Sequence, residues 1–214
     1  MIILFDLDGT LIDSTEAILE SFGVAFQTHG KEVPEDESIK AEIGHPLDVM
    51  FPTLGVAEEE VAAYVHAYKM HYRQISCAKT VLLSGAREAV ILASEHATLG
   101  VVTTKTAKYS IELLEHMDLM DYFEVLIGRE DVTHPKPHPE PIFKALSKLD
   151  SHKSQYWMVG DTPMDLMAAK AANIECVGVT CGYADESSLR EHTPKFKSEV
   201  QFLSSKIISI SALS

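Results

Sequence analysis

Short apolar runs alternate with amphipathic segments along most of this chain. Apolar runs of strand length, each too short for a stable helix, lie at residues 1–5, 99–102, 123–128, 156–159 and 176–179. Between them, apolar residues spaced three or four apart predict helices at residues 86–96, 107–117, 140–149 and 163–172. Strands that alternate with helices predict right-handed crossovers, and therefore an α/β fold with a doubly wound parallel sheet.

The segment from residue 14 to residue 79 departs from this alternation. Its apolar residues follow helical spacing throughout, and residues 31–79 show no strand pattern. We therefore predict a helical domain of residues 14–79, inserted after the first strand of a Rossmann-like core of residues 1–13 and 80–214. A polar loop with a short helix is expected over residues 182–197, followed by a final helix at 200–208.

Composition narrows the possible partners. The 214 residues are 46% hydrophobic and 23% charged, as in ordinary globular proteins. The formal net charge of -14 repels nucleic acid and anionic lipid, so we expect neither as a partner. Three cysteines without zinc spacing, no leader segment and no membrane-length apolar stretch indicate a soluble cytoplasmic protein. A monomer or a homodimer is expected.

Two carboxylates follow the first apolar run. If the chain stays extended between Asp6 and Asp8, their side chains share a face, and Gly9 permits a sharp turn directly after them. Like charges held this close are costly unless a cation or a shared proton relieves them. This pattern predicts a divalent metal, acid–base chemistry, or both.

Other polar residues end later strands. Thr103 and Asp161 each follow an apolar run, and Lys136 lies in the loop after another. Ligands of open parallel sheets bind beyond the carboxyl ends of the strands, so these residues are expected to meet at one edge.

In order and residue type, these positions resemble the four motifs of the haloacid dehalogenase superfamily of phosphotransferases. The matching segments are Asp6-x-Asp8-Gly9-Thr10, Val101-Val102-Thr103, Lys136-Pro137-His138-Pro139 and Gly160-Asp161-Thr162-Pro163-Met164-Asp165. The helical insertion resembles the small helical cap of one subfamily. Three further segments are most similar to phosphoglycolate phosphatase and its relatives: Asp13-Ser14, Gly44-His45-Pro46-Leu47 and Gly182-Tyr183.

The resemblance implies a Mg²⁺-dependent phosphatase of a small phosphomonoester, with 2-phosphoglycolate favoured. Asp6 would be the nucleophile that forms an aspartyl-phosphate, and Asp8 would protonate the leaving oxygen and then deprotonate the attacking water. Asp6, Asp161 and the main-chain carbonyl of Asp8 would hold Mg²⁺. Lys136 would balance the negative charge, and Asp165 would orient Lys136 or a metal-bound water.

The resemblance also implies residues that contact the substrate. Thr103 would donate a hydrogen bond to the phosphoryl group, and Gly9 and Thr104 would contribute from the surrounding loops. His45, on a loop of the insertion, is a candidate contact for the leaving group. The sequence departs from the family where Thr104 replaces a frequent Asn and Asn173 replaces a frequent Gly.

Alternatives within the same core are a phosphomutase of the β-phosphoglucomutase type, a pyrophosphatase and a nucleotidase. Halide release is disfavoured by Asp8. A calcium loop is disfavoured by Thr10 and Ala17, which stand where it needs ligands. A zinc site at His134 and His138 is disfavoured because no third and fourth ligand is expected nearby.

Overall fold

A computed structural model describes residues 1–149, 155–193 and 196–197. By its internal contacts the chain divides into two units. One combines Met1–Asp13 with the chain from Leu82 onward, and the other is Ser14–Val81. The chain passes between them through β2 (Ile12–Asp13) and β3 (Val81–Leu82), which form a two-stranded sheet.

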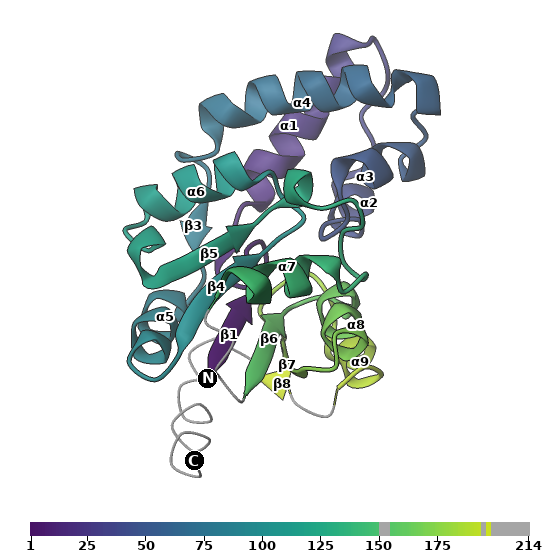
Figure 1. Ribbon diagram of the computed structural model, residues 1–214. Helices are drawn as coiled ribbons and strands as arrows, with labels where there is room; N and C mark the ends of the chain where they lie inside the picture. Colours follow the sequence, from purple (N-terminus) through teal and green to yellow (C-terminus); the bar gives the residue numbers. More distant parts are fainter. Residues whose placement is uncertain (150–154, 194–195, 198–214) are drawn as a thin grey trace. The chain divides into compact units, whose positions relative to one another are not determined.

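The first unit contains the predicted doubly wound sheet (Figure 1). Its six strands are all paired in parallel, in the order β5 (Phe123–Ile127), β4 (Thr98–Val102), β1 (Ile2–Phe5), β6 (Tyr156–Gly160), β7 (Glu175–Val179) and β8 (Phe196–Lys197). β1 is central, with Ile2 in register with both Thr98 and Tyr156. The carboxyl ends of β4, β1 and β6 therefore lie next to one another.

Helices flank this sheet. They are α5 (Ala86–Ser94), α6 (Ala107–His116), α7 (Glu140–Lys148), α8 (Pro163–Ala171) and α9 (Glu186–Arg190), with short 3-10 turns at Met120–Tyr122 and Arg129–Asp131. Ile2 and Leu4 of β1 pack in one core cluster with residues of α7 and α8. Successive strand side chains point to opposite faces, and Ile3 and Phe5 are also buried, so both faces of β1 are covered.

The second unit is helical, as the spacing predicts. It contains α1 (Thr15–Thr28), α2 (Asp36–Lys40), α3 (Leu47–Thr53), a 3-10 turn (Glu58–Glu60) and α4 (Val61–Ile75). Aromatic rings from three of these helices form its centre: Phe22 packs 4.7 Å from Phe51 and 5.1 Å from Tyr68, measured between ring centroids. The tyrosines of α4 are therefore core residues.

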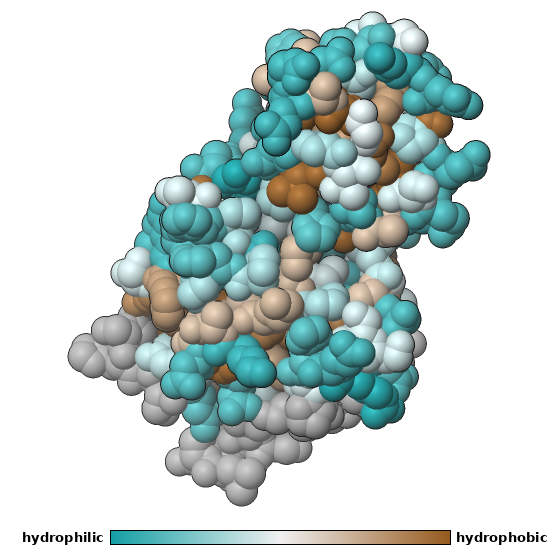
Figure 2. Space-filling model, turned by 90° about the vertical axis from the view of Figure 1, so that its right-hand side faces the viewer, coloured by the Kyte–Doolittle hydropathy of each residue, from teal (hydrophilic) through white to brown (hydrophobic). Residues whose placement is uncertain are grey.

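The elements that the pattern did not predict are the shortest ones. β2, β3 and β8 have two residues each, too few to show a period. The helix expected at residues 200–208 lies outside the described residues. On the face drawn in Figure 2, both units show hydrophilic residues together with patches of hydrophobic ones. No described helix is long and apolar enough to cross a membrane.

Candidate active site

The site begins where β1 ends. Asp6 follows the last residue of β1, and its backbone N–H donates to the Val159 carbonyl of β6 at 2.8 Å. The residue is only 4% exposed. Lys136 reaches it from the loop between β5 and α7, with Nζ 2.8 Å from Asp6 Oδ1. Two residues that the sequence placed at one edge thus form a buried ion pair.

The Lys136 ammonium has no N–H left for another partner. It can donate three hydrogen bonds, and it lies 2.8 Å from Asp6 Oδ1, 2.5 Å from Asp165 Oδ1 and 3.0 Å from the Val102 carbonyl. Burial alone would lower the pKa of this ammonium, but the carboxylates of Asp165 and Asp6 outweigh burial and raise the pKa above its ordinary value. Lys136 is therefore a fixed positive charge.

Asp165 is held by the start of its own helix. Pro163 opens α8, and Thr162 precedes it as the N-cap residue. Asp165 Oδ2 accepts from the Thr162 amide at 3.0 Å and from its hydroxyl at 2.7 Å, and Oδ1 pairs with Lys136. Both oxygens are thus engaged, and of the two partners expected for Asp165 the structure shows contact with Lys136.

Asp161 follows β6 and is fully buried. Its Oδ1 accepts from the Thr10 hydroxyl at 2.8 Å, and its Oδ2 accepts from the Tyr183 amide at 2.9 Å. A Cβ added at Gly9, which has a φ of +78°, or at Gly182 would overlap Asp161 Oδ2. Close backbone approach from two loops therefore depends on these glycines.

The carboxylates fit a divalent cation. One oxygen each from Asp6, Asp161 and Asp165 lie within 4.8 Å of one another. Burial, then the Asp165 carboxylate, raises the pKa of Asp6 to about 7, and burial followed by Asp165 and Asp6 raises the pKa of Asp161. Lys136 alone does not offset this concentration of negative charge. Hard oxygen donors of this kind suit Mg²⁺.

Asp8 lies outside this carboxylate group. Its Oδ1 is 3.2 Å from Lys105 Nζ, and the two side chains are 13% and 9% exposed. The pattern predicted that Asp8 would approach Asp6, and the Asp8 charge does contribute, as the smallest of the causes, to the raised pKa of Asp6. The turn that begins after β1 directs Asp8 to Lys105, which the motifs did not single out.

Thr103 lies at the same edge, directly after β4. Its N–H donates to the Ile127 carbonyl at 2.9 Å, and its hydroxyl oxygen accepts from the Lys105 N–H at 3.1 Å. The hydroxyl proton remains available to donate elsewhere. Thr104 follows in the loop and is half-buried.

Three residues of this region were missed by the motif analysis as contributors to the site. Thr10 and Tyr183 hold Asp161, and Lys105 pairs with Asp8. Lys105 could have been found from its position two residues beyond Thr103, at the carboxyl end of a strand. Nothing in the sequence signals the backbone N–H of Tyr183 as a donor.

His45 belongs to the second unit. It lies half-buried between α2 and α3, after Gly44, which has a φ of 109°. Its N–H donates to the Glu42 carbonyl at 3.0 Å. Its role as a substrate contact stays a prediction.

A second potential ligand group surrounds the Lys136 loop. Atoms of His134, His138 and Glu140 lie within 4.8 Å of one another, so Glu140 is a third potential ligand, which the sequence did not lead us to expect. These atoms already make hydrogen bonds. The Glu140 carboxylate accepts at 2.9 Å from the amides of Thr133 and His134 and pairs with His134 Nδ1, and the Glu140 N–H donates to His138 Nδ1 at 3.1 Å. The group therefore fastens the loop to the start of α7.

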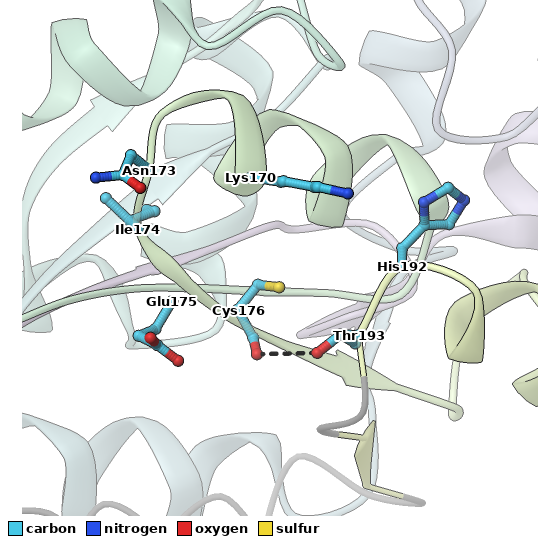
Figure 3. A pocket seen from close by; sticks show the side chains of 7 residues that line it. All are labelled: Lys170, Asn173, Ile174, Glu175, Cys176, His192 and Thr193. Carbon is cyan, nitrogen blue, oxygen red and sulfur yellow. Dashed lines mark hydrogen bonds between the residues drawn. The ribbon is translucent and has the colours of Figure 1, made fainter.

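Figure 3 shows a pocket at the amino-terminal end of β7. Its volume is about 320 Å³. It is lined by Lys170, Asn173, Ile174, Glu175, Cys176, His192 and Thr193. Glu175 and Cys176 are the first residues of β7, whereas the acidic group lies beyond the carboxyl ends of the strands. None of the predicted site residues lines this pocket.

Comparisons with known proteins show what this chain is similar to. The family model of haloacid dehalogenase-like hydrolases matches residues 3–179. The probable phosphatase IndB of Dickeya dadantii is 34% identical over 200 residues, covering 91% of this chain and 87% of that protein. The phosphoglycolate phosphatase of Yersinia pseudotuberculosis is 34% identical over 186 residues, covering 84% and 80%. The solved structure of a predicted phosphatase from Clostridium acetobutylicum has a TM-score of 0.86 at 25% identity, covering 97% and 98%.

Proposed function

Because this chain belongs to the haloacid dehalogenase-like hydrolases and is a phosphatase of that superfamily, we propose that it hydrolyses a small phosphomonoester with the help of Mg²⁺. The favoured substrate is 2-phosphoglycolate, since relatives at about a third identity carry the name phosphoglycolate phosphatase. The observation that carries this proposal is the buried contact of Lys136 with both Asp6 and Asp165 beside Asp161.

In this proposal the Asp6 carboxylate attacks phosphorus. A bond forms between the Asp6 oxygen and phosphorus, the bond from phosphorus to the ester oxygen breaks, and Asp8 donates its proton to that oxygen. Asp8 then takes a proton from water, the water oxygen attacks phosphorus, and the bond from phosphorus to Asp6 breaks. The products are the free alcohol and inorganic phosphate, and both aspartates return to their starting state.

The surrounding groups hold charge in place. Asp6, Asp161 and the main-chain carbonyl of Asp8 would hold Mg²⁺. When bound, the ion supplies positive charge that offsets the phosphoryl oxygens and the carboxylates. Lys136 is already fixed by its three acceptors, so it stabilises the negative charge without reorganisation. Thr103 would direct its hydroxyl proton to a phosphoryl oxygen, with backbone groups at Gly9 and Thr104 beside it.

The helical unit, Ser14–Val81, is proposed as a cap domain with His45 as a contact for the alcohol part of the substrate. Substitution of His45 by Ala should raise the KM for one ester more than for others. If His45→Ala has the same kcat and KM as the wild type for every substrate of a series, His45 is not a substrate contact. The cytoplasm remains the proposed location, because the three cysteines are odd in number and lack zinc spacing.

The proposal is tested by phosphate release from a panel that includes 2-phosphoglycolate, a hexose phosphate, pyrophosphate and a nucleoside monophosphate. We expect the highest kcat/KM for 2-phosphoglycolate, loss of turnover with EDTA and recovery with Mg²⁺. A mock purification from cells that lack the protein is the control for contaminating phosphatases. Preference for another panel member would reassign the substrate, formation of an isomeric sugar phosphate would indicate a mutase, and turnover that persists in Asp6→Asn would overturn the mechanism.

A further inference from the structure

We propose that Lys105 is a positioning residue that fixes the Asp8 carboxylate at the active site and supplies the second ammonium that this acidic site needs. The proposal deepens the proposed function, because it concerns the residue that would transfer the proton. It starts from the ion pair between Lys105 Nζ and Asp8 Oδ1, at 3.2 Å.

The backbone of Lys105 is fixed on both sides. Its N–H donates to the Thr103 hydroxyl oxygen at 3.1 Å, and its carbonyl accepts from the Arg129 N–H at 2.9 Å. Its side chain is only 9% exposed. Lysines on protein surfaces are mobile, and the ion pairs that they form contribute little to stability. The ammonium of Lys105, by contrast, is held at a defined place beside Asp8.

Lys136 cannot also hold the Asp8 carboxylate. Its three N–H groups are directed to Asp6, Asp165 and the Val102 carbonyl. An ammonium that pairs with Asp8 must therefore come from another residue. In the described part of the chain, Lys105 is the lysine that pairs with it.

Charge balance supports the same assignment. Four aspartates, at positions 6, 8, 161 and 165, meet two ammonium groups, those of Lys105 and Lys136. With all four carboxylates ionised, a divalent cation would bring this set to formal neutrality before an anionic ester arrives. Without Lys105 the set would keep a net negative charge and repel the phosphate, which the overall charge of -14 already repels at long range.

The position of Asp8 matters because proton transfer requires hydrogen-bond reach. General acid–base catalysis contributes roughly 100- to 10,000-fold to a rate when the group is correctly placed. Loss of the ammonium should leave Asp8 present without this ion pair, so part of this factor should be lost. The effect should appear mainly in kcat, since Asp8 acts on the reacting oxygen.

The kinetic test compares Lys105→Met with Lys108→Met, whose lysine is on α6 with a side chain 72% exposed. We expect Lys105→Met to lower kcat by about 10- to 100-fold with a smaller change in KM, and Lys108→Met to match the wild type. In Lys105→Cys, alkylation with 2-bromoethylamine rebuilds an ammonium at nearly the same length and should restore kcat. Alkylated wild-type protein is the control for the native cysteines. Unchanged kcat in Lys105→Met would overturn the proposal.

A double-mutant cycle shows whether Lys105 acts through Asp8. In the Asp8→Asn background, Lys105→Met should cause little further loss in single-turnover release of the alcohol. Losses that multiply would mean that Lys105 acts on its own and would contradict its positioning role.

A structural measurement separates failure of this inference from failure of the proposed function. Crystal structures of the wild type and Lys105→Met need no substrate. We expect the Asp8 side chain to leave its wild-type orientation while the contact between Asp6 and Lys136 is retained. An unmoved Asp8 would refute the role of Lys105 even if the enzyme proved to act on a different ester or on none in the panel.

Discussion

The Lys136 ammonium and the Asp6 carboxylate are in contact at 2.8 Å, although they come from the loop before α7 and from the end of β1. Both residues are at least 96% buried, and Lys136 also neutralises Asp165. The pair therefore joins the proposed nucleophile to the only ammonium that the described structure places in contact with it. Removing one partner of such a pair leaves charge buried without compensation.

Lys136→Met should therefore lower the free energy of unfolding by about 3 kcal/mol or more, in addition to abolishing turnover. Denaturant unfolding of the metal-free protein measures this loss. Adding Asp165→Asn to Lys136→Met should recover part of the stability, because it removes one uncompensated carboxylate. Lys108→Met is the control for loss of a lysine. Wild-type stability in Lys136→Met would show that the buried carboxylates do not depend on this ammonium.

Mg²⁺ should stabilise the protein more at about pH 8 than at about pH 5.5. The pKa of Asp6 is raised from 3.8 to about 7 in the folded protein, first by burial and then by Asp165. A raised folded-state pKa means that this group favours folding below its unfolded pKa, and that the benefit is lost as the pH rises through about 7.

Mg²⁺ competes with the proton at this carboxylate, so the ion gains affinity as the proton leaves. Thermal unfolding with and without Mg²⁺ at both pH values measures the difference. In Asp6→Asn the pH dependence of the Mg²⁺ effect should flatten. An equal rise in Tm at both pH values in the wild type would contradict a role for Asp6 in binding the ion.

The sequence was sufficient for the parts of the fold that have a strong period. The apolar run before Asp6 predicts β1, and the carboxyl-end rule predicts that Asp6, Lys136 and Asp161 meet at one edge. The pairing of Asp8 with Lys105 was harder to predict from the sequence, because it depends on the turn after β1 and on a lysine that follows a different strand. The hold on Asp161 by the Tyr183 N–H is a backbone interaction, which no side-chain pattern encodes.

Substitution of Gly182 by Ala should impair Mg²⁺ binding and turnover while leaving the fold intact. A Cβ at this position would overlap both Asp161 Oδ2 and the Gly9 carbonyl, so Asp161 must move. Mg²⁺ titration followed by calorimetry and the kcat of phosphate release measure the effect. Gly23→Ala is a matched control, because nothing lies within 4 Å of its added Cβ in α1. It should be neutral or stabilise the helix by about 0.5–1 kcal/mol. Normal Mg²⁺ affinity in Gly182→Ala would mean that Asp161 does not need its present position.

Glu140→Gln should lower the free energy of unfolding, because it removes hydrogen bonds that hold the loop carrying Lys136. The size of this loss should depend on pH. Hydrogen bonds from the backbone of Thr133 and then of His134 lower the pKa of Glu140 from 4.5 to about 2. A lowered folded-state pKa gives stability that is present above the unfolded value of 4.5 and is lost as the pH falls toward about 2.

The difference in unfolding free energy between wild type and Glu140→Gln should therefore be largest near neutral pH and smaller in acid. Denaturant unfolding at a series of pH values measures it, and the exposed Glu59→Gln is the control for loss of one negative charge. A difference that is constant from neutral to acid pH would show that the carboxylate does not hold the loop through these hydrogen bonds.

Whether Asp6 bonds to phosphorus is tested most directly by trapping the intermediate. Borohydride reduces an aspartyl-phosphate to homoserine, so protein quenched during turnover of its best substrate and reduced should carry homoserine at position 6. Peptide mass spectrometry locates the modified residue, and protein reduced without substrate is the control. Homoserine at position 6, dependent on substrate and Mg²⁺, is the expected result. Homoserine at another aspartate, or none in a protein that is turning over, would contradict nucleophilic attack by Asp6.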